Sequence, residues 1–186
     1  MTDLLNVLLG AAATLLLIGV PARFVGFAAQ RPKDYRNGEP RFDIRRELRG
    51  DILCEGVIYG PLGRVASRFV ADMKATWDGP NCVMSERFRY DSGRTQDREW
   101  QLALGNDGAI KARADDLIGT GRGQQDGSAV LLRYKIRLPQ QSGGHVLSVT
   151  DWRYMTPNGT IINRSQFRKF GIKVAELVAT MRRVAA

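Results

Sequence analysis

Two segments of the chain place a charged side chain among aromatic ones at every second position. Glu86 shares this spacing with Phe88 and Tyr90, and Arg98 shares it with Trp100. Residues two apart in a β-strand point to the same face, so both charges are predicted to enter an apolar interior. Buried charges need partners, and an arginine can grip a carboxylate through two hydrogen bonds. We therefore predict a Glu86–Arg98 ion pair, either as a structural contact or as a clamp for the polar head of a ligand.

Further acidic positions could support acid–base chemistry or bind a cation. Asp115 and Asp116 are adjacent, and Asp151 precedes Trp152 in a strand-like segment. Neighbouring carboxylates serve both kinds of chemistry, but they are also common in turns and caps. The turn interpretation is favoured, so no catalytic residue and no metal ligand is assigned. Asp116, Asp151, Trp152 and Arg164 are instead added to the candidate ligand-binding residues.

The sequence contains no motif of a familiar enzyme. A Walker loop, a GxSxG elbow and an HExxH motif are all missing, and the lone His145 follows two glycines in a predicted turn. The glycine-rich stretch 119–127 precedes the strand-like stretch 130–138 and not a helix, so a hairpin is favoured over a nucleotide site. The sequence therefore predicts no cofactor. Cys54 and Cys82 are interpreted as small core residues, with one disulfide in an oxidising compartment as the alternative.

Turn signals recur at short intervals after residue 50, and the hydrophobic period between them is two. Val130, Leu132 and Tyr134 alternate with Arg133 and Lys135. One wet face and one buried face are typical of an antiparallel sheet. About eight strands are predicted, and they must close or stack because open sheet edges invite aggregation. We expect a mainly β protein, an antiparallel up-and-down barrel, with a two-sheet β-sandwich as the alternative. The C-terminal stretch fits a closing strand better than a helix.

An uncharged run of nineteen residues, 4–22, precedes this domain. As a helix it would be about 28 Å long, enough to cross a hydrocarbon core. A cleaved signal peptide is the alternative, although its basic n-region is missing. The predicted organisation is a transmembrane anchor over residues 1–30, a juxtamembrane linker over 31–49 and a β-barrel over 50–186. This organisation predicts a single-pass protein of the bacterial cytoplasmic membrane, and the basic residues after the run favour a cytoplasmic domain.

The net charge of +9 falls entirely on the region after the first thirty residues, because Asp3 and Arg23 cancel there. A basic domain can meet anionic lipids or nucleic acid. The predicted anchor already places the domain at a bilayer. An anionic membrane surface is therefore the predicted partner, and nucleic acid is not.

Short motifs spread from about residue 35 to residue 171 are also informative together. They are Pro40-Arg41-Phe42-Asp43, Arg68-Phe69, Met73 to Trp77, Glu86 to Gly93, Arg98-Glu99-Trp100, Ala114-Asp115-Asp116, Gly119, Gly123, Gly127, Asp151 to Tyr154, Asn163-Arg164 and Lys169-Phe170-Gly171. These motifs resemble a proteobacterial family of unknown function whose members are described as envelope lipoproteins. The resemblance implies a lipocalin-like barrel, a periplasmic location and a lipid-related accessory role beside fatty-acyl-modifying enzymes. The chain departs from the family in having an apolar run in place of a lipobox cysteine, and Ser128 and Thr150 at two family positions.

These observations predict a membrane-tethered accessory protein that binds a lipid or fatty-acyl chain in its lumen. The residues expected to line the cup and to order its polar end are Trp77, Phe88, Tyr90, Trp100, Glu86, Arg98 and Arg164. One alternative is a lipid-modifying enzyme that uses Asp115, Asp116 or Asp151. Another is a solid-core scaffold that docks a lipid-modifying partner enzyme at the membrane. The volume of the cup separates the first hypothesis from the scaffold.

Overall fold

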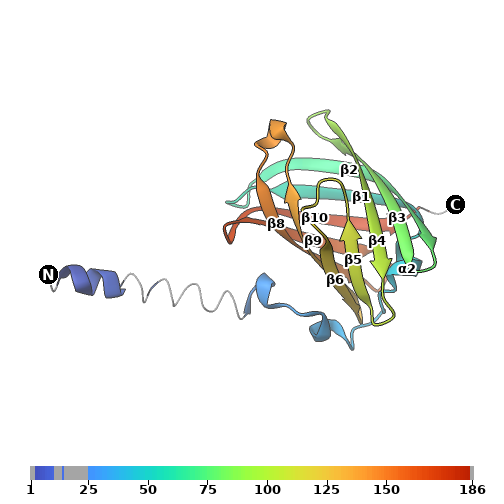
Figure 1. Cartoon of the computed structure of the whole chain (residues 1–186), viewed down its shortest axis with the longest axis horizontal. Coiled ribbons are helices and arrows are strands. Elements are labelled where there is room, and N and C mark those ends of the chain that lie inside the picture. The colour runs from blue at the N-terminus through green and yellow to red at the C-terminus, as the bar shows by residue number, and fades with distance from the viewer. Residues whose placement is uncertain (1–2, 11–13, 15–24, 185–186) are drawn as a thin grey trace.

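The computed structural model describes residues 3–10, 14 and 25–184, and its main feature is a closed β-barrel (Figure 1). Every strand pairs antiparallel with its neighbours in the sequence, and β1 pairs with β10 to complete the ring. The strands are β1 (Gly50–Tyr59), β2 (Val65–Asp78), β3 (Asn81–Tyr90), β4 (Thr95–Leu104), β5 (Ala109–Arg113), β6 (Gly121–Asp126), β7 (Ala129–Arg137), β8 (Val146–Met155), β9 (Ile161–Lys169) and β10 (Ile172–Arg183). The predicted mainly β, antiparallel barrel is confirmed, and the C-terminal stretch is the strand that closes it.

The barrel has ten strands and not about eight. One additional strand, β6, lies inside the glycine-rich stretch that the sequence pattern assigns to a single turn. Gly123 is required there, because a Cβ atom at this position would lie 2.2 Å from the carbonyl oxygen of Leu131. The other arises at Phe170–Gly171, where two residues with positive φ turn the chain between β9 and β10. Phenylalanine is not a usual residue for such a turn, so the sequence carries no strong signal for it.

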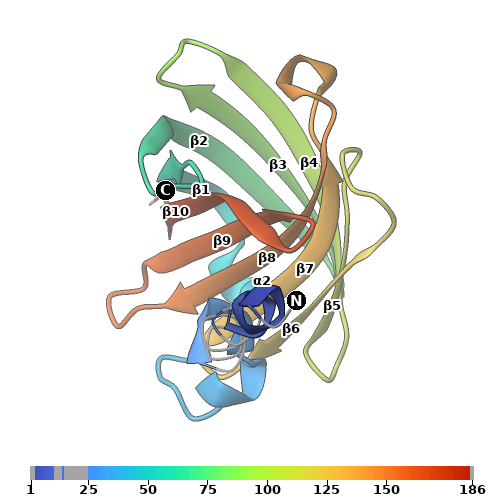
Figure 2. The ribbon, with the colours of Figure 1, turned by 90° about the vertical axis from the view of Figure 1, so that its left-hand side faces the viewer.

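The N-terminal segment of the domain runs along one side of the barrel and then passes beneath one end (Figures 1 and 2). It contains two short 3₁₀ turns, η1 (Phe27–Ala29) and η2 (Pro32–Tyr35), and the short helix α2 (Ile44–Glu47). A third 3₁₀ turn, η3 (Gln140–Ser142), lies elsewhere, in the β7–β8 hairpin. The Ser128 amide donates to the Tyr35 carbonyl at 3.2 Å, and the Phe42 amide donates to the Gly127 carbonyl at 2.8 Å. These bonds tie the segment to the β6–β7 hairpin.

Three apolar residues of this segment plug the end of the barrel that we call the closed end. Phe42, Ile44 and Leu48 are fully buried and belong to the main hydrophobic core. The indole Nε1 of Trp77 donates to the Leu48 carbonyl at 2.6 Å, which fixes the plug to β2. Trp77, expected to line the ligand cup, therefore lies at the closed end. The opposite end, formed by the β1–β2, β3–β4, β7–β8 and β9–β10 hairpins, is called the open end.

The predicted membrane span is only partly described. Residues 3–10 are helical, and the rest of the run apart from residue 14 lies outside the described residues. Within the part of the chain that the structure describes, no helix has both the length and the apolar character needed to cross a bilayer. On this finding, the predicted localisation as a single-pass protein of the cytoplasmic membrane is wrong.

Candidate functional site

A layer of charged and polar side chains crosses the lumen midway between the two ends. Its members come from five strands and are Glu86, Arg98, Tyr134, Asp151, Arg153, Asn163 and Ser165. They line a cavity of about 80 Å³. Glu86 on β3 and Arg98 on β4 lie directly opposite each other in the strand register. The period-two pattern of both strands points both side chains inward.

Arg98 does not form the predicted ion pair with Glu86. Its guanidinium group bonds to the Asp116 carboxylate, with nitrogen–oxygen distances of 3.0 and 3.1 Å, and lies 4.0 Å from the Trp100 ring centroid. Asp116 belongs to the loop between β5 and β6, and its carbonyl accepts a hydrogen bond from the Arg137 amide of β7. Tertiary structure thus brings in a partner that pairing between neighbouring strands could not predict.

A second ion pair lies deeper in the lumen, on a single strand. Asp151 and Arg153 are both buried on β8 and are joined at 3.0 Å. The Asp151 carboxylate also accepts hydrogen bonds from Ser165 Oγ, at 2.8 Å, and from the Asn163 amide. The Nε of Arg153 is buried and has no hydrogen-bond partner among the described residues. Arg153 was missed by the sequence interpretation, although its position two residues after Asp151 is a signal that could have found it.

Glu86 is the buried acid of this layer without an ion pair among the described residues. Burial raises the pKa of its carboxyl group, and this effect outweighs the nearby Arg98 and Arg153 charges and a hydrogen bond with Trp100, all of which lower the pKa. The layer holds three acidic groups, counting Asp116, and two guanidinium groups. A neutral Glu86 therefore leaves the layer electrically balanced.

Two other groups of the interior also favour their neutral forms. Burial raises the pKa of the Tyr134 hydroxyl, and burial raises the pKa of the Cys54 thiol to about 12. Cys54 and Cys82 are both buried and free, as the core interpretation predicts.

Above the charged layer, towards the open end, the lumen is lined by aromatic rings. The Phe69 and Phe88 ring centroids lie 5.4 Å apart, and Phe88 stacks on Tyr90 at 6.1 Å. Gly56 makes room for this cluster, since a Cβ atom there would lie 2.7 Å from the Phe69 ring. Phe88 and Tyr90 are only half-buried. The open end is therefore a shallow apolar cup with a charged floor.

Two of the candidate ligand-binding residues lie outside the lumen. Trp152 points outward because its neighbour Asp151 points inward, and it is buried beneath the N-terminal segment, with its ring centroid 5.3 Å from that of Tyr35. Arg164 also points outward, pairs with Glu176 at 2.5 Å and packs over the Phe27 ring. The structure brings the others to the lumen, its edge or its mouth; they are Glu86, Phe88, Tyr90, Arg98, Trp100, Asp116 and Asp151.

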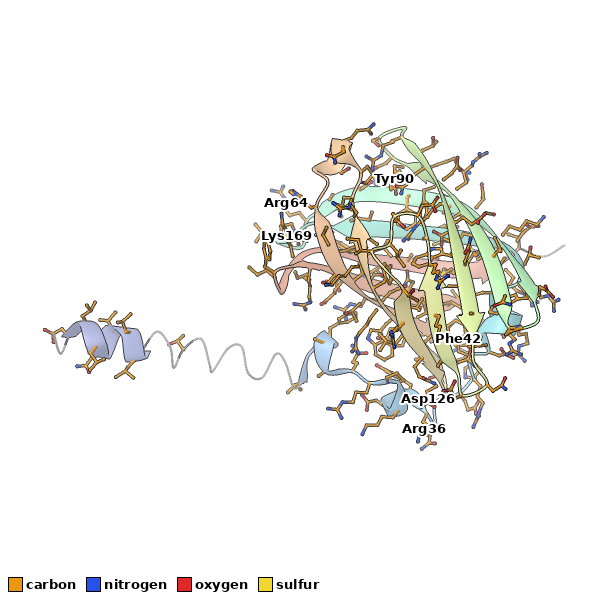
Figure 3. All side chains as sticks on the ribbon, in the orientation of Figure 1. Arg36, Phe42, Arg64, Tyr90, Asp126 and Lys169 are labelled. Atoms are coloured by element: carbon orange, nitrogen blue, oxygen red, sulfur yellow. The ribbon has the colours of Figure 1, made fainter. Side chains whose placement is uncertain are left out.

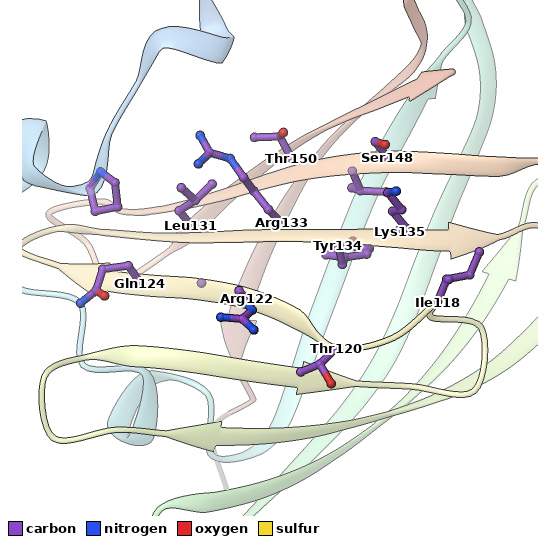
Figure 4. Close-up of a pocket in the computed structure, with 13 residues that line it drawn as sticks. Ile118, Thr120, Arg122, Gln124, Leu131, Arg133, Tyr134, Lys135, Ser148 and Thr150 are labelled. Atoms are coloured by element: carbon purple, nitrogen blue, oxygen red, sulfur yellow. The ribbon is translucent and has the colours of Figure 1, made fainter. Parts of the chain in front are cut away.

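A larger cavity of about 820 Å³ lies along β6, β7 and β8 (Figure 4). It is an open groove with three cationic side chains, Arg122, Arg133 and Lys135, and none of its lining residues is acidic. Arg122 and Arg133 lie opposite each other in the strand register, and Figure 4 shows their guanidinium groups pointing apart. We call the surface formed by Arg122, Arg133 and Lys135 the basic wall. Like charges in opposed positions repel, so the basic wall does not stabilise the barrel.

The barrel is similar to two solved structures. The S-type phycobiliprotein lyase CPES from Guillardia theta is 10% identical, with a TM-score of 0.56 over 84% of this chain and 99% of that one. Rv2717c from M. tuberculosis is 13% identical, with a TM-score of 0.54 over 76% of this chain and 97% of that one. At such identities the likeness shows the fold alone, and it confirms a lipocalin-like barrel.

No curated protein sequence matches the chain. A family model does, and it spans residues 22–183, which include every strand of the barrel and the whole charged layer. The chain therefore belongs to the family described as protein of unknown function (DUF3833).

Proposed function

We propose that this barrel binds a small amphipathic ligand of lipid or fatty-acyl character through its open end. The observation that carries the proposal is the buried Nε of Arg153, a hydrogen-bond donor without an acceptor on the floor of an aromatic cup. An unpaired buried donor is costly, and a ligand oxygen would remove that cost. The rings of Phe69 and Phe88 offer apolar contact to the remainder of such a ligand.

The size of the cavity limits how the ligand is held. Enclosed sites for whole small molecules have volumes of about 300–1,000 Å³. The lumen cavity measures about 80 Å³, which suits a polar head group and not an entire acyl chain. We infer that the head enters first and that the chain lies between the half-buried side chains at the mouth, Phe88, Phe167 and Leu177.

The charge balance of the layer favours a head group with acceptor oxygens. With Glu86 neutral, the charges of Arg98 and Arg153 are offset by Asp116 and Asp151 alone. A carboxylate or ester carbonyl can then accept from Arg153 without facing an ionised Glu86. The affinity for a carboxylate should fall as the pH rises through the raised pKa of Glu86, since two like charges would then share the site.

A lipid-modifying enzyme is the alternative of a different class. Asp116 and Asp151 are the acids of this hypothesis that reach the lumen, and each is held by an arginine. Asp115 is exposed in the adjoining loop. Carboxylates engaged in this way suit a structural or positioning role better than that of a free general base, so binding is the function we favour.

The scaffold alternative makes the opposite claim about the lumen. Under this hypothesis the cavity of about 80 Å³ is a packing gap in a solid core, and no ligand binds there. The family resemblance supports a lipid-modifying enzyme as a partner under either hypothesis. The net charge of +9 supports an anionic membrane surface as a second partner, from which a lipid ligand would be drawn.

The test compares binding inside the lumen with binding outside it. The full chain is purified in detergent and analysed by native mass spectrometry for a co-purified lipid, and then titrated with the fluorescent fatty acid cis-parinaric acid. Leu177→Trp fills the mouth, whereas Val178→Trp places the same ring at the next, outward position of β10. We expect the first variant to lose the bound lipid and the fluorescence response, and the second to keep both. Equal binding by both variants, or no ligand on the unmodified chain, would overturn the proposal.

A further inference from the structure

Three hairpins form one continuous edge at the open end, which we call the rim. They are the β1–β2, β7–β8 and β9–β10 hairpins, at residues 60–64, 138–145 and 170–171. The first and third are neighbours because β1 pairs with β10. The second and third touch where Lys169 Nζ lies 3.1 Å from His145 Nδ1. Figure 3 places Arg64 and Lys169 at this same end of the molecule.

The rim displays apolar side chains to solvent. Phe170 is 93% exposed and Leu62 is 90% exposed, the highest values for large hydrophobic side chains among the described residues. Ile172 is 69% exposed beside them. The hairpins that carry these side chains are neighbours through the β1–β10 pairing, and exposed apolar side chains gathered in one region mark an interaction surface.

Phe170 is also unfavourable for the turn that it occupies. Its φ is 51°, and Gly171 follows with a φ of 82°, so both central residues of the hairpin turn lie in the left-handed region. Asn, Asp and Gly are the residues that favour this conformation, and a phenylalanine there is strained. The exposed ring cannot repay that strain by packing in the barrel. Its presence therefore points to a contact outside the folded chain.

The charge of the rim is positive throughout. The stretches 56–71, 137–150 and 165–175 contain no acidic residue. Arg68, beside the rim, pairs with Asp91 at 3.0 Å, whereas Arg64 and Lys169 have no ion-pair partner among the described residues. The Lys169 amine lies 5.7 Å from the Phe170 ring centroid. Lys173 is paired, with Glu176 at 2.8 Å. Exposed rings and aliphatic tips surrounded by cations are the pattern of a surface that enters a lipid headgroup region.

We propose that the rim docks on the surface of a membrane that contains anionic lipids. Leu62, Phe170 and Ile172 enter the interfacial region, and Arg64 and Lys169 pair with anionic headgroups. A bilayer fits better than a protein partner, because the apolar groups stand at the tips of hairpins rather than in a groove, and the cations beside them match anionic headgroups. The inference deepens the proposed function by naming the surface that turns the mouth of the barrel towards lipid, but the docking does not require a ligand in the lumen.

The experiment uses the full chain with an environment-sensitive dye at one cysteine. Leu62→Cys carries the dye on the rim, and Val83→Cys carries it on the exposed outer face of β3 as a matched control. The native cysteines are buried and should not react. With vesicles of phosphatidylcholine and phosphatidylglycerol we expect a blue shift and a rise in emission at position 62 and no change at position 83. A dye at position 62 that stays in water, or responds equally to pure phosphatidylcholine, would overturn the proposal.

Charge reversal separates the rim from the net charge of the protein. Arg64→Glu with Lys169→Glu changes the net charge by the same amount as Arg122→Glu with Arg133→Glu on the basic wall. Each cation near an anionic surface contributes about 1 kcal/mol, so the rim pair should raise the lipid concentration at half-maximal response by about 30-fold or more. The wall pair should change it little. Equal effects would show that only net charge matters and would contradict docking by the rim.

Phe170→Asn tests the aromatic tip without endangering the fold, since asparagine suits the turn. We expect the lipid concentration at half-maximal dye response to rise by about tenfold, because burying one aromatic side chain in the membrane contributes at least that factor to the affinity. Binding of cis-parinaric acid in detergent should be unchanged in this variant. A rim failure with intact lumen binding would therefore overturn the docking alone, and a lumen failure with intact docking would overturn the proposed function alone. An unchanged dye response in Phe170→Asn would contradict the insertion of this ring.

Discussion

The two ends of the barrel are built from the same ten strands, yet they differ in almost every physical respect. At the closed end, Phe42, Ile44 and Leu48 fill the space between the strands and are fully buried. At the open end, Phe88 and Tyr90 are half-buried, and Phe170 stands in solvent. Apolar side chains point inward at both ends, such as Leu102 and Leu104 at the closed end and Phe69 and Phe88 at the open end, so the strand pattern alone does not cause the difference.

The difference arises from a segment outside the barrel. The chain from residue 42 to residue 48 passes beneath one end only, and it is fixed there by bonds to Gly127, Trp77 and the Gln125 side chain. Without such a plug, the aromatic rings at the other end form a cup above the charged layer. A barrel thus becomes a container when one end receives an additional segment and the other does not.

Phe42→Ala should have the largest effect on stability. The ring is fully buried in the plug, and removing a buried phenylalanine typically costs about 3–5 kcal/mol because a cavity remains. The free energy of unfolding from urea titration measures the loss. Phe88→Ala at the mouth is the matched comparison, and it should cost less than half as much because this ring is half-buried. Equal losses would show that the two ends are packed alike.

Arg98→Met should reveal which acid is the true partner of this arginine. The Arg98 side chain is 17% exposed and that of Asp116 is 32% exposed, so partial screening limits the loss to about 1–3 kcal/mol. Adding Asp116→Asn should recover part of this loss, since it removes the acid left unpaired. Adding Glu86→Gln to Arg98→Met instead should recover less of the loss, because Glu86 forms no ion pair with Arg98. A double-mutant cycle measures both couplings, and a larger coupling to Glu86 would restore the sequence-based pairing.

Glu86→Gln should change how stability depends on pH. A carboxyl group whose pKa is raised by folding contributes stability that is complete below its unfolded value of 4.5 and is lost as the pH rises through the folded pKa. Above that window the glutamine variant should be the more stable protein, by about 1.4 kcal/mol for each unit by which the pKa is raised. The difference in Tm between the two proteins, measured from pH 4 upward in steps of about one pH unit, checks the sign of this pH dependence. A constant difference would mean that Glu86 does not titrate in this range.

Phe170→Asn should have the smallest effect on stability, and it should be favourable. A side chain in the left-handed region costs about 1–2 kcal/mol, and asparagine tolerates this region better, so a gain of roughly 0.5–1 kcal/mol is expected. Thermal unfolding measures the gain. Leu62→Asn in the neighbouring hairpin is the control and should stay within about 0.5 kcal/mol of the unmodified chain. A loss of stability in Phe170→Asn would show that the ring packs on the barrel after all.

The alternation of apolar and polar residues predicted an antiparallel barrel ahead of a two-sheet sandwich, and it pointed Glu86 and Arg98 inward, where the structure places them. This is possible because strand periodicity is a local property that each segment expresses by itself. The same locality explains the errors in the strand count. The strand β6 has glycines at the alternate positions where apolar side chains would mark a strand. The turn at Phe170 lacks the Asn or Asp that normally marks such a turn.

Two partnerships were decided by the tertiary structure alone. Asp116 reaches Arg98 from a loop, and residues 27–35 bury Trp152 from outside. Neither contact follows from the alternation within a strand, because a loop and a segment outside the barrel supply one of the partners. The sequence by itself determined the alternation that points Glu86 and Arg98 into the lumen. The closed and plugged barrel determined which charges are satisfied there, and it leaves the Nε of Arg153 without an acceptor among the described residues.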